Sequence, residues 1–200
     1  MDTKQLNEKE SLELIARMIR NTQNNLESHG GMYILIWGYT TIGISLLVYF
    51  LLTCTHNPAY NFFWFGIPLI GGAIISITFR SRPLQKITTY IDKVTNYIWL
   101  VVGLTAGFTS IAAFFTRLPI LFIIALLISI GITITGLVIK FRLLTVFGFI
   151  SIALSYSLLV ITGLDSILIF CVLFILNSII PGHVLNHSEK KNRQKPEDHV

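Results

Sequence analysis

The stretch from residue 119 to residue 139 reads PILFIIALLISIGITITGLVI and contains no charged side chain. A helix needs about 20 mostly apolar residues to cross roughly 30 Å of hydrocarbon, so this stretch has the required length and composition. It lacks the strict alternation of apolar and polar residues that is typical of a transmembrane barrel strand. The stretch therefore predicts a helix that crosses a lipid bilayer.

Five further apolar stretches of similar length are separated from it and from one another by polar residues. The chain has 200 residues, of which 53% are hydrophobic and 12% charged, and this composition excludes an ordinary water-soluble fold. Unpaired backbone groups are costly in hydrocarbon, so each stretch is expected to be helical. The six predicted spans are 32–53, 62–79, 97–115, 119–139, 143–162 and 166–185.

The fold class predicted from these spans is all-α, a polytopic membrane protein with the lipid bilayer as its surroundings. We divide the chain into three parts. Residues 1–31 are predicted to form an amphipathic cytoplasmic helix, residues 32–185 the six-helix transmembrane domain, and residues 186–200 a disordered basic cytoplasmic tail.

The Lys and Arg residues are distributed unequally between the two sides of the predicted membrane domain. The chain has 15 Lys and Arg residues. Of these, Arg117 alone falls on the side of the membrane that holds the loop between spans three and four. Cytoplasmic loops carry an excess of Lys and Arg, so both termini are predicted to be cytoplasmic. The net charge of +5 is thereby explained by topology, and nucleic acid is not expected as a partner. The residues on the basic side are Lys4, Lys9, Arg17, Arg20, Arg80, Arg82, Lys86, Lys93, Lys140, Arg142, Lys190, Lys191, Arg193 and Lys195.

Two cytoplasmic stretches carry apolar residues at helical spacing. The first is expected to begin after a cap at Asn7 and to end at Gly30-Gly31. We hypothesise that the two apolar stripes pack against each other or bind a second protein, whereas the alternative is that each lies in the headgroup layer. The candidate docking residues are Leu12, Ile15, Ile19 and Leu26 in the first stretch and Leu84, Ile87 and Ile91 in the second.

Small residues in the spans indicate where helices approach one another. Gly103 and Gly107 form a GxxxG pattern, for which we expect close packing inside the bundle, with a homo-oligomer as the alternative. Pro68 marks span two as the candidate for a kink. Cys54 and Cys171 are expected to be free thiols, although they could pair if spans one and six are neighbours.

Ionisable side chains are absent from the predicted span centres, which argues against a proton-coupled pump, a voltage sensor or a haem protein with facing histidines. We predict no catalytic residue, no cofactor and no metal site. His183 and His187 are four residues apart, but two imidazoles without a third ligand make a weak metal site. Hydroxyl groups in spans three to five could line a polar path, although such groups more often bond to backbone or join helices.

The segment ESLELI at residues 10–15, continued by Asn25-Leu26-Glu27 and by Ile36-Trp37-Gly38-Tyr39, resembles small uncharacterised multi-pass membrane proteins of bacteria. The resemblance is confined to the residues before and at the start of the first span. It implies an inner-membrane protein and no established activity, and it assigns a role to no residue.

The sequence therefore favours a non-enzymatic anchor or accessory protein that engages a cytoplasmic or membrane protein partner through its cytoplasmic helices. The alternative is a small-solute permease or a transporter subunit, with hydroxyl groups lining the path.

Overall fold

The computed structural model describes residues 8–80 and 90–193, and these residues form helices and turns without a strand. Within them, six helical stretches are long and apolar enough to cross a membrane, which confirms the six predicted spans. In chain order they are Gly31–Thr55, Pro58–Thr78, Lys93–Ala112, Ile120–Val138, Arg142–Val160 and Asp165–His187. The protein is an all-α, multi-pass membrane protein.

Three of the spans are built from more than one helical segment. Span two joins a 3₁₀ helix to an α-helix, span five has a short final turn, and span six contains a π-helical turn. The elements are α1 (Glu8–Thr55), η1 (Pro58–Phe65), α2 (Gly66–Arg80), α3 (Tyr90–Ala112), α4 (Ile120–Val138), α5 (Arg142–Ser155), α6 (Ser157–Val160), α7 (Asp165–Phe174), η2 (Ile175–Ile179) and α8 (Ile180–Arg193).

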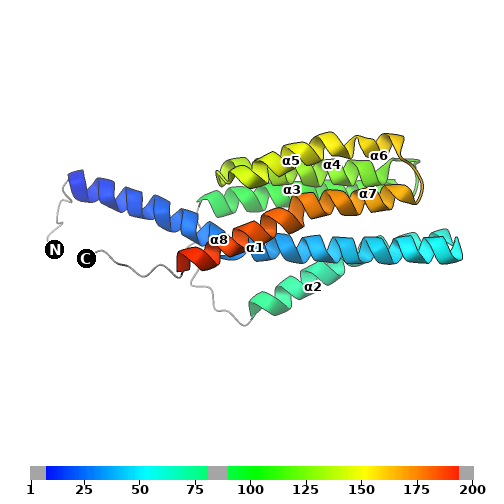
Figure 1. Ribbon diagram of the computed structural model, residues 1–200, viewed down its shortest axis with the longest axis horizontal. Coiled ribbons are helices and arrows are strands. Elements are labelled where there is room, and N and C mark those ends of the chain that lie inside the picture. Colours follow the sequence, from blue (N-terminus) through cyan, green and yellow to red (C-terminus); the bar gives the residue numbers. More distant parts are fainter. Residues whose placement is uncertain (1–7, 81–89, 194–200) are drawn as a thin grey trace.

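The helices form two closely packed pairs with a further helix on each side. Span six runs antiparallel to α1, and α4 runs antiparallel to α5 (Figure 1). The helix α2 packs on α1, and α3 packs on α4. Spans two and three therefore present most of their apolar surface outward, as expected for helices in contact with lipid.

Glycines bring α1 and span six into close contact. A Cβ atom on Gly38 would lie 2.7 Å from the Cβ of Ser178, and one on Gly182 would lie 2.8 Å from Cγ of Leu35. A Cβ on Gly31 would lie 3.1 Å from the backbone nitrogen of Asn186. The residue numbers of each contacting pair add to 216 or 217, so one antiparallel register holds along the seam. Small residues here allow the two backbones to approach.

The other helix contacts follow the same rule. Gly71 of α2 receives the Trp37 ring of α1, and Gly131 of α4 receives Val102 of α3. Between α4 and α5, Gly148 lies against Thr133, and a Cβ on Gly136 would lie 2.7 Å from the backbone nitrogen of Thr145. Each of these helix pairs thus places a glycine where the neighbouring side chain or backbone comes closest.

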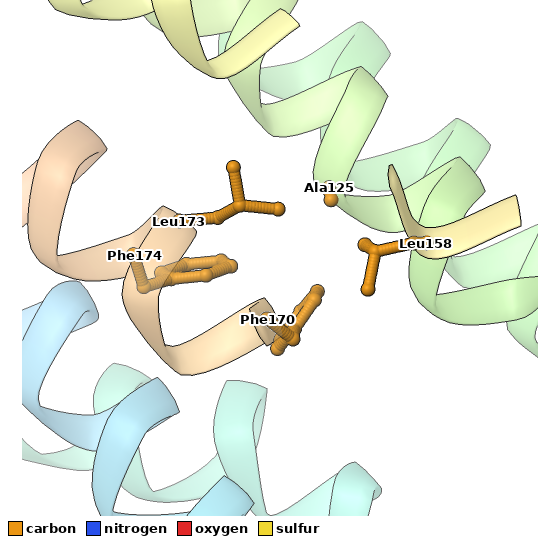
Figure 2. Packing of buried hydrophobic residues seen from close by; sticks show 5 residues of the cluster. All are labelled: Ala125, Leu158, Phe170, Leu173 and Phe174. Carbon is orange, nitrogen blue, oxygen red and sulfur yellow. The ribbon is translucent and has the colours of Figure 1, made fainter. Parts of the chain in front are cut away.

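A cluster of buried apolar residues joins span six to α4 and α6. Figure 2 shows Phe170, Leu173 and Phe174 pointing toward Ala125 of α4 and Leu158 of α6. The Phe170 and Phe174 rings lie 4.8 Å apart between centroids, and Trp64 meets Phe170 edge-on at 5.7 Å. Aromatic pairs at these distances add about 0.5–1.5 kcal/mol each beyond their burial. The cluster packs span six against α4 and α6, and Trp64 adds a contact with η1.

Two predicted boundaries were wrong. The helix expected to end at Gly30-Gly31 continues through both glycines, so α1 is a single helix from Glu8 to Thr55. The predicted disordered tail begins as helix, because α8 runs to Arg193. The physical reason is tertiary: α8 and the start of span one are held together at Gly31 and Leu185, so neither helix ends at the membrane boundary. Residues 194–200 lie outside the described residues.

Two further expectations concern Pro68 and the cysteines. Pro68 is the third residue of α2, and the change of geometry in span two comes earlier, between η1 and α2. Spans one and six are neighbours, yet Cys54 and Cys171 are both free. The register explains this, because Cys54 is level with residue 162 rather than with Cys171.

We expect Gly38→Val to lower the thermal unfolding temperature of the detergent-purified protein, because the new side chain would overlap Ser178 and force α1 away from span six. Overpacking of this kind costs about 1–3 kcal/mol. The matched control is Gly43→Val in the same helix, where no atom of the described residues lies within 4 Å of the Cβ position. Equal losses in the two variants would contradict the proposed seam.

Candidate functional site

A cluster of polar side chains lies at the centre of the bundle, and we call Ser129, Ser151 and Asn177 the midplane cluster. Ser129 is the midpoint of Ile120–Val138, Ser151 that of Arg142–Val160, and Asn177 is one residue past the midpoint of Asp165–His187. Their exposed fractions are 0%, 0% and 1%. Three spans therefore bring uncharged polar groups to the depth at which a bilayer is most apolar.

The π-helical turn in span six places Asn177. Pro181 is buried and has no N–H, so it cannot donate to the carbonyl of Asn177 as a helix interior requires. The chain adjusts by widening the preceding turn, and the N–H of Ile180 donates to the carbonyl of Ile175 five residues back. Such π turns inside α-helices are frequent at functional sites. The proline thus explains why the interruption occurs at Asn177.

A hydrogen bond between spans four and six ties two members of the cluster together. The amide nitrogen Nδ2 of Asn177 donates to Oγ of Ser129 over 2.8 Å, and Oγ of Ser129 in turn donates to the carbonyl of Ala125 over 2.7 Å. Ser129 therefore both donates and accepts. The carbonyl oxygen Oδ1 of Asn177 and Oγ of Ser151 are buried and have no partner among the described residues.

The register of the α4–α5 hairpin places Ser151 near the other two residues. Gly148 meets Thr133 and Gly136 meets Thr145, so the numbers of facing residues add to 281. Ser151 is therefore level with Ile130, one residue from Ser129. The helix α5 also packs on η2, the segment that carries Asn177. All three members of the midplane cluster thus belong to one junction of α4, α5 and span six.

Most other hydroxyl groups in the spans bond within their own helices. Thr109 donates to Thr105, Ser110 to Ala106, Thr133 to Ser129, Thr135 to Gly131, and Ser155 to Ile152, in each case to a backbone carbonyl. These groups are satisfied without a ligand. Among the described residues of spans three to five, buried hydroxyl groups without a partner occur at Thr95 and Ser151, so the hydroxyl-lined path predicted as an alternative gains support only at these two positions.

Asn177 is not among the residues predicted from the sequence, because its amide is not an ionisable group. The signal was present in the letters LFILNSIIPG at residues 173–182, where an asparagine interrupts an apolar run and a proline follows four residues later. An amide inside a span combined with a proline that removes its helical donor is a pattern that could have identified the position.

The candidate docking residues are only partly described. Leu12, Ile15, Ile19 and Leu26 belong to α1, whose backbone is helical there. Ile91 is a half-buried residue near the start of α3. Leu84 and Ile87 lie outside the described residues. Helical spacing in the first stretch is thus compatible with the observed helix, and contact between the two stripes stays a prediction.

Gly103 and Gly107 do not take part in the packing expected of them within the bundle. Both are exposed on α3, and a Cβ on either would meet no atom of the described residues within 4 Å. The contact between α3 and α4 is made instead by Val102 against Gly131. Packing between copies of the chain at this pattern stays a prediction.

The described residues contain no group of three His, Cys, Asp or Glu side chains that could hold a metal ion. A hydrogen bond of 2.7 Å between Oη of Tyr39 and Nε2 of His183 joins α1 to α8. The midplane cluster itself carries an amide and two hydroxyls. Such groups do not titrate near neutral pH, so the cluster can bind and orient a polar group but cannot act as an acid or base.

Comparison with known proteins adds no assignment. No family model matches the chain, and neither a curated protein nor a solved structure is significantly similar to it.

We expect the double variant Gly103→Val and Gly107→Val to leave the unfolding temperature of the monomer unchanged, because both positions face open space in the described structure. The control is Gly148→Val, whose side chain would overlap Thr133 and should lower the unfolding temperature. If the GxxxG pattern joins two copies, chemical crosslinking in membranes will lose its dimer band in the double variant. A large loss of monomer stability would show that α3 packs differently.

Proposed function

We propose that this protein is a non-enzymatic accessory protein of a bacterial inner membrane, and that the amino-terminal part of α1 binds a protein partner in the cytoplasm. The transmembrane bundle serves as its anchor. The observation that carries the proposal is the continuity of α1 from Glu8 to Thr55.

The continuity of α1 bears on where its amino-terminal part can lie. A helix resting in the headgroup layer runs along the membrane plane, whereas span one crosses it, so a break is needed between them. The backbone of α1 has no such break at Gly30-Gly31. In Figure 1 the blue part of α1 continues away from the bundle instead of folding across its end. Residues 8–30 add roughly 35 Å of helix beyond the start of span one at 1.5 Å per residue.

The chemistry of this extension suits a helical partner. Leu12, Ile15, Ile19 and Leu26 recur at spacings of three, four and seven, which is the pattern by which an amphipathic helix enters an apolar groove or a coiled coil. Arg17 and Arg20 fall between them along the chain and keep the helix soluble. We therefore propose a cytoplasmic or membrane-associated protein with an exposed apolar helix face as the partner.

The proposed orientation, with both termini in the cytoplasm, rests on the distribution of Lys and Arg. Lys140 adds a structural argument. It follows α4 with φ of 56°, and the N–H of Phe141 donates to the carbonyl of Gly136 in a helix-ending motif that usually has glycine at this position. A left-handed backbone costs a residue with a Cβ about 1–2 kcal/mol. A lysine at this position supports a role for its charge in holding the α4–α5 loop on the cytoplasmic side.

We expect the double variant Ile15→Glu and Ile19→Glu to insert normally but to lose partner crosslinks in native membranes, because two carboxylates would replace the apolar stripe. The measurement is crosslinking followed by gentle-detergent purification of the tagged, full-length protein and identification of the crosslinked chain.

The matched control is Asn21→Glu and Asn24→Glu. At 100° per residue these positions fall on the opposite side of the helix from the stripe, so the control adds the same charge and should keep the crosslinks. Loss in both double variants would indicate a charge effect rather than a docking face. Unchanged crosslinks in the stripe variant would refute the proposal.

We expect a membrane-impermeant maleimide to label Cys54 from outside intact spheroplasts, because Cys54 is exposed near the end of span one that the proposed topology places outside the cytoplasm. Cys171 is buried and should stay unlabelled. The variant Cys54→Ser is the control and should abolish labelling. Labelling of Cys54 only after the membrane is opened would reverse the proposed orientation.

A small-solute permease is the second candidate, and the interrupted span six favours it. Transporters commonly place their sites at broken helices near the bilayer midplane. Its test is the swelling rate of proteoliposomes in glycerol or urea, with the Asn177→Leu variant as comparison. A rate equal to that of protein-free liposomes would remove this candidate and leave the accessory role untouched.

A further inference from the structure

The midplane cluster holds two buried polar atoms whose hydrogen-bonding capacity is unused within the described residues. These are Oδ1 of Asn177, which can only accept, and Oγ of Ser151, which can donate and accept. A buried polar group without a partner costs about 1–3 kcal/mol. Two such groups near one junction, in residues that are 1% and 0% exposed, point to a ligand that satisfies them.

The π turn leaves a further acceptor beside Asn177. In an α-helix the carbonyl of Leu176 would accept from Ile180, but that N–H donates to Ile175 instead. In a π-helix it would accept from residue 181, which is a proline without an N–H. The carbonyl of Leu176 therefore lacks both of its usual helical donors, and the stretch around Asn177 is rich in acceptors.

The charge balance of the site selects an uncharged ligand. No acidic side chain lies in the central part of any described span, so a cation at the midplane would have only neutral oxygens to replace its hydration. An isolated ion in a medium of low dielectric constant carries a desolvation cost of several kcal/mol. A neutral group with two or more N–H or O–H donors satisfies the acceptors without that cost.

The residues that surround the midplane cluster on α4 and α5 have small side chains. Gly148, Ser151 and Ser155 lie on the buried side of α5, and Ser129 is buried on α4. All have side chains of two heavy atoms or fewer. Leu173 and Phe174, which precede Asn177 on span six by four and three residues, are bulky and belong to the apolar cluster that Figure 2 shows.

We propose that Asn177 and Ser151 bind a neutral, water-sized hydrogen-bond donor at the midplane of the bundle. Its source is either a water molecule or the amide or hydroxyl end of a small solute. Oδ1 of Asn177 accepts from the ligand, and Oγ of Ser151 completes its hydrogen bonding. Ser129 holds the Asn177 amide in the orientation that directs Oδ1 away from α4. The inference is independent of the proposed docking role of α1, and its solute form deepens the permease candidate.

The test is difference infrared spectroscopy of the full-length protein in lipid nanodiscs. Spectra recorded in ordinary water and in water labelled with oxygen-18 are subtracted, so that only bound water contributes to the stretching region. The same samples are then recorded with and without urea, a neutral donor, and with sodium chloride replaced by choline chloride.

If water is the ligand, the wild-type protein will show an oxygen-18-sensitive band that is lost in Asn177→Leu and shifted in Ser151→Ala. If a solute is the ligand, that band will be missing, and urea will shift the Asn177 amide carbonyl band in the wild type but not in Ser151→Ala. Either result supports the site, and the two distinguish its source.

The control is Ser45→Ala, which removes another fully buried hydroxyl that already donates to the carbonyl of Thr41. It should leave the bands unchanged. Because Asn177→Leu also removes the bond to Ser129, the smaller change Ser151→Ala keeps the test valid if the first variant fails to fold. Spectra that respond neither to oxygen-18 nor to urea would overturn the proposal, and a response to sodium removal would replace the neutral ligand with a cation.

Discussion

Close approach of helix backbones at glycine residues is the constraint on which the rest of this structure depends. Lipid chains are as apolar as leucine, so burying an apolar side chain between helices gains little in a bilayer. Association must come from dispersion contacts and from polar groups that meet inside the bundle. Gly38 and Gly182 provide those contacts between α1 and span six, and Gly131 and Gly148 provide them on either side of α4. Each glycine removes a Cβ that would otherwise hold two helices apart.

The midplane cluster is a consequence of this packing. Ser129 and Ser151 come to the same depth because Gly148 and Gly136 set the register of the α4–α5 hairpin. Asn177 joins them because the apolar cluster around Phe170 and Leu173 fixes span six against α4. The hydrogen bond from Asn177 to Ser129 then links span six to α4. In a medium of low dielectric constant such a polar contact is stronger than it would be in water. Oδ1 of Asn177 remains without a partner among the described residues, and it is the atom that accepts from the proposed ligand.

The long helix α1 gives the molecule its second functional feature. Span six contacts the membrane part of α1 from Leu185 beside Gly31 to Cys171 beside Ser45. The part beyond Gly31 belongs to the same helix. A partner bound to that part would therefore act on a helix that is in direct contact with the π turn. The proposed docking surface thus lies on the same continuous helix that contacts the segment carrying Asn177.

The sequence by itself determined the fold class, the number of spans and most of their limits, because bilayer thickness and the need to satisfy backbone groups leave few alternatives for apolar stretches of this length. It could not determine which small residues lie at contacts. Gly103 and Gly107 form the GxxxG pattern that is typical of helix contacts in membranes, but the observed contacts lie at Gly38, Gly131 and Gly148. A contact also requires a residue on the neighbouring helix that faces the glycine. Nor could it show that α1 passes through Gly30-Gly31, or that Asn177 meets Ser129. These features depend on residues far apart in the chain, and only the tertiary structure decided them because the register between antiparallel helices fixes which residues face each other.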